Sequence, residues 1–166
     1  MAYVIEDSDK CSISNNASIG EGTIIKIGSI IEDNSVIGNN CIIGPYAHIH
    51  SATVIGDNCV IGNFVEIKHS SLANNVKVKH LAYLGDLECG SNVNIGCGVV
   101  IANYDGVNKH KTIIKDNVFV GCNSNLIAPL IVGSNAFIAA GSSVNEDVLD
   151  NEFVIERSNE IHKKRK

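Results

Sequence analysis

The sequence of residues 31–67, IEDNSVIGNNCIIGPYAHIHSATVIGDNCVIGNFVEI, has an isoleucine at every sixth position. The same spacing extends backwards through Ile25 and Ile19 to Ile13, so that ten isoleucines follow one another without a slip. Four positions after the first nine of them stands a small or β-branched residue: Ala17, Thr23, Ser29, Ser35, Cys41, Ala47, Thr53, Cys59 and Val65. A period of six fits neither the 3.6-residue period of a helix nor the two-residue period of a simple strand.

Six-residue repeats are typical of a parallel β-helix, a prism with three faces of short strands in which one coil takes three hexads. We expect each isoleucine to point into the prism, with the small residue packed beside it. Each isoleucine that is fully buried in this way contributes ~1.5–3 kcal/mol. The prediction is therefore an all-β, hexapeptide-repeat solenoid that fills a single domain of 166 residues.

After Ile67 the register changes but can still be followed. Two steps of five residues shorten the next coils to seventeen, and the core candidates are Leu72, Val78, Leu84, Cys89, Ile95 and Ile101. The hexads resume later, at Ile114, Val120, Leu126, Val132, Ile138 and Val144. Because the step from Ile101 to Ile114 is thirteen positions, we expect residues 102–112 to leave the prism as an extruded loop.

Three segments follow from this register. We expect residues 1–12 to form an N-terminal cap over the first coil and residues 13–150 to form the β-helix. Residues 151–166 are too polar for another coil and end in a basic run, so a short C-terminal arm or helix is expected there.

Composition excludes several function classes. The net charge of −5 argues against a nucleic-acid-binding surface. We expect no secretory signal and no membrane span, because no basic start precedes an apolar stretch and no apolar run approaches ~20 residues. Six cysteines without a CxxC pair indicate reduced thiols rather than a zinc ribbon, with Cys41, Cys59 and Cys89 as core residues. The cytoplasm is the expected compartment.

Counting by coil also predicts which side chains stack, ~4.8 Å apart. One column reads Ile27, Pro45, Asn63, His80, Cys97, Cys122 and Ala140. A second column reads Ser14, Glu32, His50, Lys68, Gly85 and Ala102, and just before it come His48, Glu66 and Tyr83. We therefore expect His80, Lys68, Tyr83, His50 and Glu66 on one edge, above a channel of small residues that suits a long, thin ligand.

The chemistry of this edge has more than one interpretation. His80 can serve as a general base near neutral pH, or it can be an ordinary exposed histidine. Lys68 can bind an anionic substrate or be a solvated charge. Zinc binding is a further possibility, because the edge carries three histidines, His48, His50 and His80. No carboxylate or cysteine stands at a spacing that would complete the ligand set, so we expect no metal.

Several segments resemble one particular family. They are GPYAHIH, IGNFVEIK, HLAYLGDLECGSNVNIG, NYDGVNKHKT and FVGCNSNLIAPLIVG. They are similar to the C-terminal half of the bifunctional N-acetylglucosamine-1-phosphate uridyltransferase/glucosamine-1-phosphate N-acetyltransferase, from about residue 13 to the tail. The resemblance implies a left-handed β-helix and a homotrimer with active sites between subunits. It also implies acetyl-CoA as the donor and an amino sugar phosphate as the acceptor.

The resemblance assigns roles residue by residue. His80 matches the general base that deprotonates the sugar amine. The matches to sugar contacts are Lys68, Tyr83 and Asn94, with Lys109 near the phosphate. The matches to acetyl-CoA contacts are Cys97, Asn103, Tyr104, Cys122, Ala140 and Arg157. A backbone N–H near Cys97 is then the expected donor to the tetrahedral oxyanion.

Three departures from the family pattern stand out. No nucleotidyltransferase half precedes the repeat, so uridyl transfer is not expected from this sequence. His50-Ser51-Ala52 replaces an Arg-Pro-Gly whose arginine grips the sugar phosphate, and histidine lacks that bidentate fork. Cys97 and Cys122 replace an alanine and a serine in the donor groove.

The sequence thus predicts an acetyl-CoA-dependent N-acetyltransferase for glucosamine-1-phosphate or a closely related amino sugar. One alternative keeps the donor but changes the acceptor to a nucleotide-linked amino sugar or a sugar hydroxyl. The others are a zinc-dependent hydratase on the same prism and an inactive scaffold.

Overall fold

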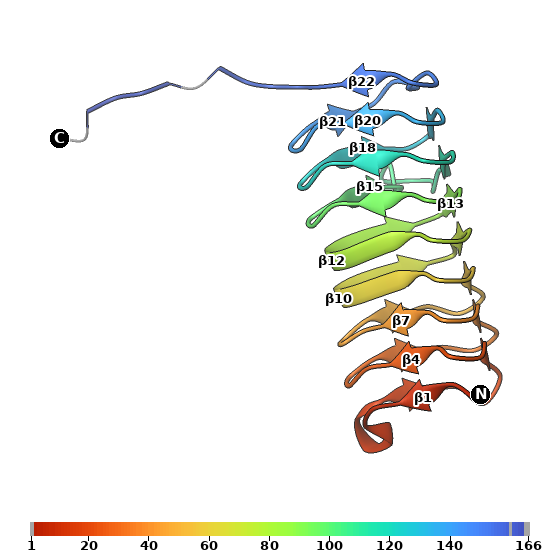
Figure 1. The fold of residues 1–166 in the computed structure, drawn as a ribbon. Coiled ribbons are helices and arrows are strands. Elements are labelled where there is room, and N and C mark those ends of the chain that lie inside the picture. Colours follow the sequence, from red (N-terminus) through yellow and green to blue (C-terminus); the bar gives the residue numbers. More distant parts are fainter. Residues whose placement is uncertain (1, 160, 165–166) are drawn as a thin grey trace.

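The structure is a computed structural model that describes residues 2–159 and 161–164. Its short parallel strands stack into a single column of coils, from β1 at one end to β22 at the other (Figure 1). From β1 to β19 every coil has strand structure on each of three faces, and the faces meet at three corners. The chain is therefore a parallel β-helix, as the six-residue period predicts.

The strands of the first face are β1 (Val4–Ile5), β4 (Ile24–Ile25), β7 (Ile42–Ile43), the start of β10 (Val60–Lys68) and of β12 (Lys77–Gly85), β14 (Asn94–Ile95), β17 (Phe119–Val120), β20 (Phe137–Ile138) and β22 (Phe153–Val154). Those of the second face are β2 (Ser12–Ile13), β5 (Ile30–Ile31), β8 (His48–Ile49), the ends of β10 and β12, β15 (Val100–Ala102), β18 (Asn125–Ile127) and β21 (Ser143–Val144). Those of the third face are β3 (Ser18–Ile19), β6 (Val36–Ile37), β9 (Val54–Ile55), β11 (Ser71–Leu72), β13 (Leu87–Cys89), β16 (Thr112–Ile114) and β19 (Leu130–Val132). A 3-10 turn, η1 (Ser8–Lys10), lies between β1 and β2.

The strand register confirms the coil count made from the sequence. On the first face Ile25 pairs with Ile43 and Ile43 with Ile61, eighteen residues apart each time. Ile61 then pairs with Val78, a step of seventeen, and farther on Ile95 pairs with Val120, a step of twenty-five. The core positions predicted from Ile25 onward are buried. Ile13 and Ile19 are only partly buried, because their coil lies near the end of the stack.

Several small polar residues inside the prism make side-chain hydrogen bonds across coils, whereas the buried hydroxyls of Thr53 and Thr112 have no partner among the described residues. The hydroxyl of Thr23 donates to the carbonyl of Gly38 at 2.8 Å, and that of Ser35 donates to the carbonyl of His50 at 3.1 Å. The expected core thiols, Cys41, Cys59 and Cys89, are buried, and burial raises the pKa of the Cys89 thiol to about 12. Burial therefore gives all three residues a place in the core, and the raised pKa fits an unreactive thiol at Cys89.

Asparagines line the corner between the third and first faces. The side-chain amides of Asn75, Asn92, Asn117 and Asn135 each donate to the next asparagine along the column, ending at Asn151, at 3.0–3.1 Å. These residues have positive φ, a conformation that asparagine tolerates better than most side chains. The ladder therefore stabilises the turns of successive coils.

β10 and β12 differ from the other strands because each continues for nine residues around the corner between the first and second faces. Their register pairs Asn63 with His80 and Lys68 with Gly85. These two broad strands lie midway along the stack (Figure 1).

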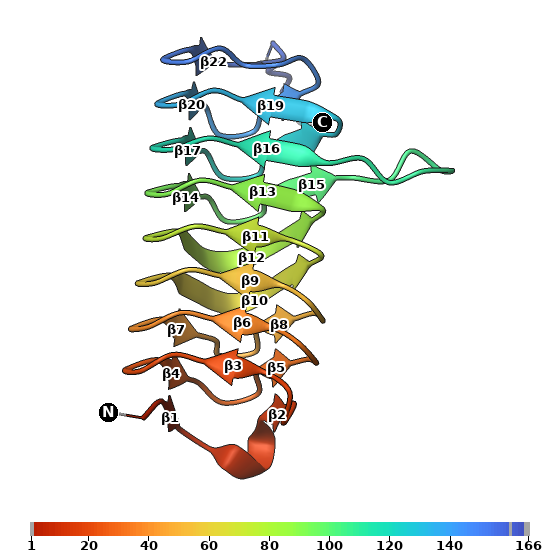
Figure 2. The ribbon, with the colours of Figure 1, turned by 90° about the vertical axis from the view of Figure 1, so that its right-hand side faces the viewer.

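The ends and the loop extend from this frame. β1 already pairs with β4, so residues 4–5 belong to the first coil itself. Residues 103–111 leave the prism between β15 and β16 as a long projection (Figure 2), while Ala102 and Thr112 belong to the flanking strands. β22 pairs with β20, and the described residues beyond Arg157 run away from the prism without forming a helix. Within the described part of the chain, no helix has the length and apolar character that a membrane crossing requires.

Candidate functional site

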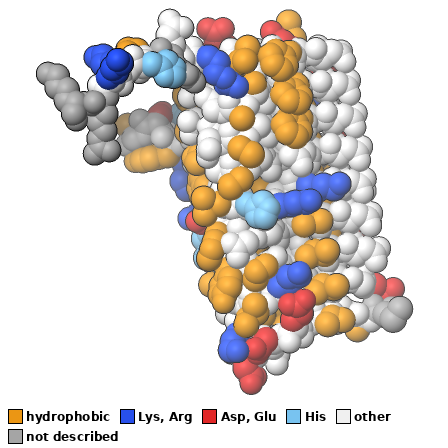
Figure 3. Space-filling view, turned by 60° about the vertical axis from the view of Figure 1, so that its left-hand side comes forward, with side chains coloured by type: hydrophobic (Ala, Val, Ile, Leu, Met, Phe, Trp, Pro, Cys, Tyr) orange, Lys and Arg blue, Asp and Glu red, His pale blue; other side chains and the backbone are white. Residues whose placement is uncertain are grey.

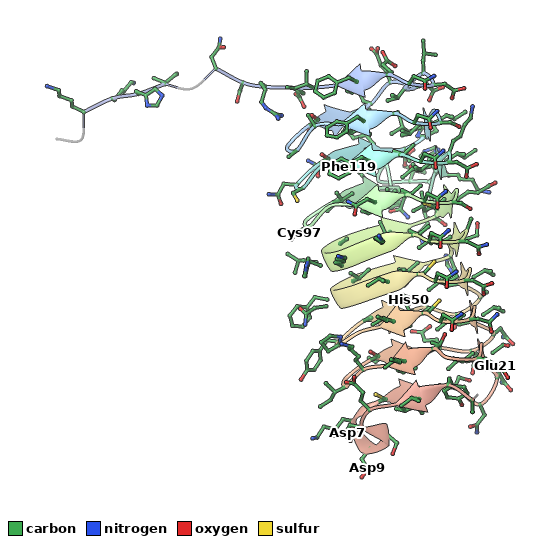
Figure 4. All side chains as sticks on the ribbon, viewed as in Figure 1. Asp7, Asp9, Glu21, His50, Cys97 and Phe119 are labelled. Atoms are coloured by element: carbon green, nitrogen blue, oxygen red, sulfur yellow. The ribbon has the colours of Figure 1, made fainter. Side chains whose placement is uncertain are left out.

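The column predicted from His80 to Ala140 exists, at the corner between the first and second faces. The carbonyl of Leu81, next to His80, accepts from the N–H of Gly98, next to Cys97, at 2.7 Å. The carbonyls of Cys97 and Cys122 accept in turn from Asn123 and Gly141, at 2.8 Å each. His80, Cys97, Cys122 and Ala140 therefore lie on successive coils of one corner, which we call the base corner, and all four are exposed. Cys97 projects from this corner in Figure 4.

Glycines let the coils of the base corner approach closely. A Cβ at Gly96 would lie 2.6 Å from the backbone nitrogen of Cys122, closer than real Cβ atoms come. A Cβ at Gly121 would meet the backbone of Ala140 in the same way. The surface above His80 is thus made of backbone and small side chains, which suits a narrow ligand lying along the coils.

Arg157 reaches the top of the base corner. Glu156 is tied to β21, because its carboxylate accepts from the N–H of Ser143 at 2.6 Å and its N–H donates to the hydroxyl of Ser142 at 3.1 Å. Arg157 follows, and its Nη1 lies 4.0 Å from the place where a Cβ on Gly141 would be. A permanent positive charge therefore stands beside the last coil of the column.

A second group of candidates lies at the corner between the second and third faces. Lys68 pairs with Gly85 there, and a Cβ at Gly85 would lie 2.5 Å from the Tyr83 hydroxyl and 2.7 Å from Nδ2 of Asn103. A larger residue at this position would displace the ends of these two side chains. We call this group, with residues 103–111, the loop corner.

The loop is held in a defined shape by Asp105. Its Oδ1 accepts from the N–H groups of Val107 and Asn108 at 2.7 and 2.6 Å, and its Oδ2 lies 2.6 Å from Nε2 of His110. The hydrogen bond from His110, and then those from the backbone, hold the pKa of the Asp105 carboxyl well below its usual range. Tyr104 and Lys109 face each other in an antiparallel bridge, and both are exposed.

The expectation that His80, Lys68, Tyr83, His50 and Glu66 share one edge is wrong for His80. The other four lie together, because Glu66 pairs with Tyr83 and contacts His50, whose N–H donates to the carbonyl next to Lys68. His80 lies at the base corner and Lys68 at the loop corner, with the width of the second face between them. Gly85, the partner of Lys68, follows His80 by five residues in β12. These residues cross the whole second face, a length along the chain of ~17 Å at ~3.3 Å per residue. The reason is geometric: positions 68 and 80 differ by twelve residues, which is not a whole coil. Asn94 lies on the first face, paired with Lys77 and Phe119.

The histidines of the second face do have carboxylate partners, contrary to the sequence analysis. Nε2 of His48 lies 2.7 Å from Oε1 of Glu32, and Nε2 of His50 lies 2.8 Å from Oε1 of Glu66. Nδ1 of His50 faces Oε1 of Glu32 at 3.4 Å, and the two imidazole rings stack with centroids 3.9 Å apart. The hydrogen bond from His48, followed by that from the Ser51 N–H, lowers the pKa of Glu32 to about 2. His80 has no part in this cluster.

Sequence reasoning also missed Asp86, whose Oδ2 accepts from Nδ2 of Asn103 at 2.5 Å. The signal was present, because Asp86 precedes Asn103 by seventeen residues, one coil in this part of the chain. Within one chain, the candidates for binding acetyl-CoA are therefore divided: Cys97, Cys122, Ala140 and Arg157 at the base corner, Asn103 and Tyr104 at the loop corner.

Comparison with known proteins gives both a family and relatives. The family model described as bacterial transferase hexapeptide (six repeats) matches residues 16–51, 34–69 and 111–146. The chain is 49% identical over 160 residues to the bifunctional protein GlmU of Listeria monocytogenes, covering 93% of this chain and 35% of that protein. It is 56% identical over 119 residues to GlmU of Thermoanaerobacter pseudethanolicus, covering 72% of this chain and 26% of that one. The chain thus spans about a third or less of the length of these relatives.

Solved structures agree on the fold. A UDP-N-acetylglucosamine acyltransferase from Campylobacter jejuni superposes with a TM-score of 0.62 at 17% identity, over 90% of this chain and 70% of that one. LpxA from Acinetobacter baumannii superposes with a TM-score of 0.55 at 19% identity, over 89% and 64%. At these identities the likeness is one of architecture.

Proposed function

Because the chain belongs to the bacterial transferase hexapeptide family, we propose that it transfers the acetyl group of acetyl-CoA to the amine of glucosamine-1-phosphate or a closely related amino sugar. The similarity to GlmU proteins at 47–56% identity supports this choice of donor and acceptor. The observation that carries the proposal is the base corner, where an exposed imidazole is followed by a column of small residues with an arginine at its far end.

The reaction assigns one task to each part of the base corner. The extended donor lies along Cys97, Cys122 and Ala140, with Arg157 near its phosphates. His80 accepts a proton from the amine as the nitrogen attacks the thioester carbonyl, so that a C–N bond forms and the C–S bond breaks. Coenzyme A leaves as the thiolate and takes up a proton. A backbone N–H near Cys97 stabilises the oxyanion of the tetrahedral intermediate.

The acceptor uses polar side chains of the second face and its surroundings. Lys68 and Tyr83 of one copy hold the sugar from the loop corner, with Lys109 of the loop near its phosphate. Asn94, on the first face, and His80 approach the same sugar from the base corner of the neighbouring copy. His50 occupies the place where the resembling family has an arginine, and it is already held between Glu32 and Glu66. Two carboxylates next to that position disfavour a phosphate, which supports the alternative acceptors, a nucleotide-linked amino sugar or a sugar hydroxyl.

The division of the candidates between two corners supports a homotrimer. If the loop corner of one copy meets the base corner of the next, then Asn103, Tyr104 and Lys109 complete a site that one chain leaves open. Apolar side chains crowd the surface beside the base corner, including Tyr46, Phe64 and Leu81, each at least half exposed. Hydrophobic side chains run in rows along this side of the prism (Figure 3), as expected for a surface that another copy covers.

Two experiments test the proposed function. Purified chain is mixed with acetyl-CoA and a panel of glucosamine-1-phosphate, nucleotide-linked amino sugars and neutral sugars, and free thiol is followed. Turnover of glucosamine-1-phosphate supports it as the acceptor, and turnover of another sugar alone identifies that sugar as the acceptor instead. No thiol release with any sugar refutes the proposed acetyltransferase activity. Sedimentation equilibrium measures the mass of the protein in solution. A mass of three chains supports the homotrimer, and a mass of one chain contradicts it. The cytoplasm, where acetyl-CoA is made and six free thiols stay reduced, is the compartment we propose.

A further inference from the structure

We propose that Glu32, His48 and His50 form a binding site for one divalent first-row transition-metal ion, of which Zn²⁺ is the probe. One donor atom from each residue lies within 4.8 Å of the other two. Two imidazoles and a carboxylate are a ligand set that zinc and its neighbours accept, and three protein ligands leave a fourth position for water or a substrate atom. The inference is independent of the acetyltransferase proposal.

The backbone brings the three ligands together. His48 and His50 flank the buried Ile49 in β8, so both point outward from the second face. Glu32 lies one coil away, where its N–H donates to the carbonyl of Ile49 at 2.9 Å. The ligands are therefore carried by two hydrogen-bonded coils rather than by a loop, which favours a site that exists before the ion arrives.

A nitrogen from each of the two imidazoles lies close to the same carboxylate oxygen of Glu32. Oε1 of Glu32 lies 2.7 Å from Nε2 of His48 and 3.4 Å from Nδ1 of His50. Ligand atoms bound tetrahedrally at ~2.1 Å lie ~3.4 Å apart, so the His50 distance already fits and the His48 distance needs a small rotation of the Glu32 side chain. Both Glu32 and His48 have 35% of the side chain exposed, which gives an ion access.

Each of two ligands also has the outer hydrogen bond that metal ligands usually have. Nε2 of His50 points away from Glu32 and lies 2.8 Å from a carboxylate oxygen of Glu66. A proton on Nε2 that is donated to Glu66 leaves the lone pair of Nδ1 free to bind an ion. Oε2 of Glu32 accepts from both the N–H and the hydroxyl of Ser51, at 3.0 and 2.9 Å. That leaves Oε1 for the ion. An ordinary surface ion pair does not require this second layer of contacts.

A binding experiment on the full chain tests the site. Protein stripped with a chelator is titrated with Zn²⁺ by calorimetry near pH 7.5, without acetyl-CoA or sugar, so the result does not depend on acetyl transfer. We expect one saturable equivalent per chain and none for Mg²⁺, which prefers oxygen ligands. Glu32→Gln and His48→Gln should abolish saturable binding, and Glu66→Gln should weaken it by about 10–100-fold. His110→Gln is the matched control, because His110 also pairs with a carboxylate but has no second imidazole in its contact set.

Two further readouts keep the test decisive. Zn²⁺ should raise the melting temperature of the wild type and of His110→Gln but not that of His48→Gln. A cooperative melting transition of His48→Gln without metal shows that this variant folds. The Co²⁺ complex should show visible d–d bands without a thiolate charge-transfer band, which excludes the exposed thiols Cys97 and Cys122 as the ligands. No saturable Zn²⁺ binding, binding unchanged in His48→Gln, or a cobalt–thiolate band would each overturn the proposal.

Discussion

Asn103 donates a hydrogen bond from its buried side chain to Oδ2 of Asp86, one coil below, at 2.5 Å. This contact fixes the residue from which the loop departs and holds its amide beside the Tyr83 hydroxyl over Gly85. The orientation of the loop therefore depends on the carboxylate of Asp86.

Loss of the Asp86–Asn103 contact is expected to weaken acetyl-CoA binding without slowing the acetyl-transfer step. Asp86→Gly removes the acceptor and tolerates the positive φ of this position. A lost hydrogen bond of ~1–1.5 kcal/mol corresponds to a KM for acetyl-CoA raised about 5–10-fold, with kcat within about twofold. Asp86→Asn keeps an acceptor oxygen and should show a smaller change. Steady-state kinetics measure both, and an unchanged KM in Asp86→Gly would contradict the role.

His80 is expected to carry the proton transfer. His80→Ala should lower kcat by roughly 10²–10⁴-fold, the usual contribution of a general base, while acetyl-CoA still binds in calorimetry. His69→Asn is the matched control for kcat, since His69 is another exposed corner histidine and asparagine suits its positive φ. Only kcat is compared, because Nδ1 of His69 lies 3.8 Å from Oδ1 of Asp86. Equal turnover in the wild type and His80→Ala would remove His80 from the mechanism.

His50 is expected to set the preference for a phosphorylated acceptor. His50→Arg introduces a permanent charge and a bidentate fork between Glu32 and Glu66. We expect KM for glucosamine-1-phosphate to fall about threefold or more relative to KM for glucosamine, measured with a chelator present. The ratio of the two constants is the readout, and a ratio that does not change would show that position 50 does not face the phosphate.

The lowered pKa of Glu32 makes the stability of the folded chain vary with pH in the acidic range. Its pKa is lowered from 4.5 to about 2 in the folded chain, so the folded state favours the ionised carboxylate. The stabilisation is present above pH ~4.5 and is lost as the pH falls toward the folded value near 2. Glu32→Gln should therefore lower the melting temperature at pH 7, and the difference from wild type should shrink below pH ~4. Glu146→Gln, at an exposed site, is the control; a difference that grows at low pH would reverse the assignment.

Neighbouring residues of β9 test the inward–outward alternation. Ile55 is 1% exposed, and Ile55→Ala should lower the free energy of unfolding by ~2–5 kcal/mol through lost burial and a cavity. Val54 is 44% exposed, and Val54→Ala should cost less than ~1 kcal/mol. Urea unfolding at one protein concentration compares them. Equal costs would mean that the alternation does not determine stability.

The core could be read from the sequence almost completely. Ile31 to Ile67 fall on inward positions because a hexad is a local pattern, and each residue needs only its own place in the repeat to be assigned. The shortened coils and the projecting loop were also foreseen, since insertions and deletions appear directly as changed steps between core residues.

The base corner could be predicted for the same reason. His80, Cys97, Cys122 and Ala140 stack because the residues between them make whole coils, and that count needs no coordinates. The contact between Asp86 and Asn103 obeys the same rule and could have been found by applying it to every polar residue.

The six-residue period by itself determined the prism, its core and the columns along each corner, because inward burial and coil length are properties of the linear pattern. Only the tertiary structure decided how the columns relate across a face: that a full face separates His80 from Lys68, and that Glu32 and Glu66 engage His48 and His50. Those relations depend on how the coil bends at each corner and on the directions of long, partly exposed side chains. Neither is encoded in a repeat that specifies only what points inward.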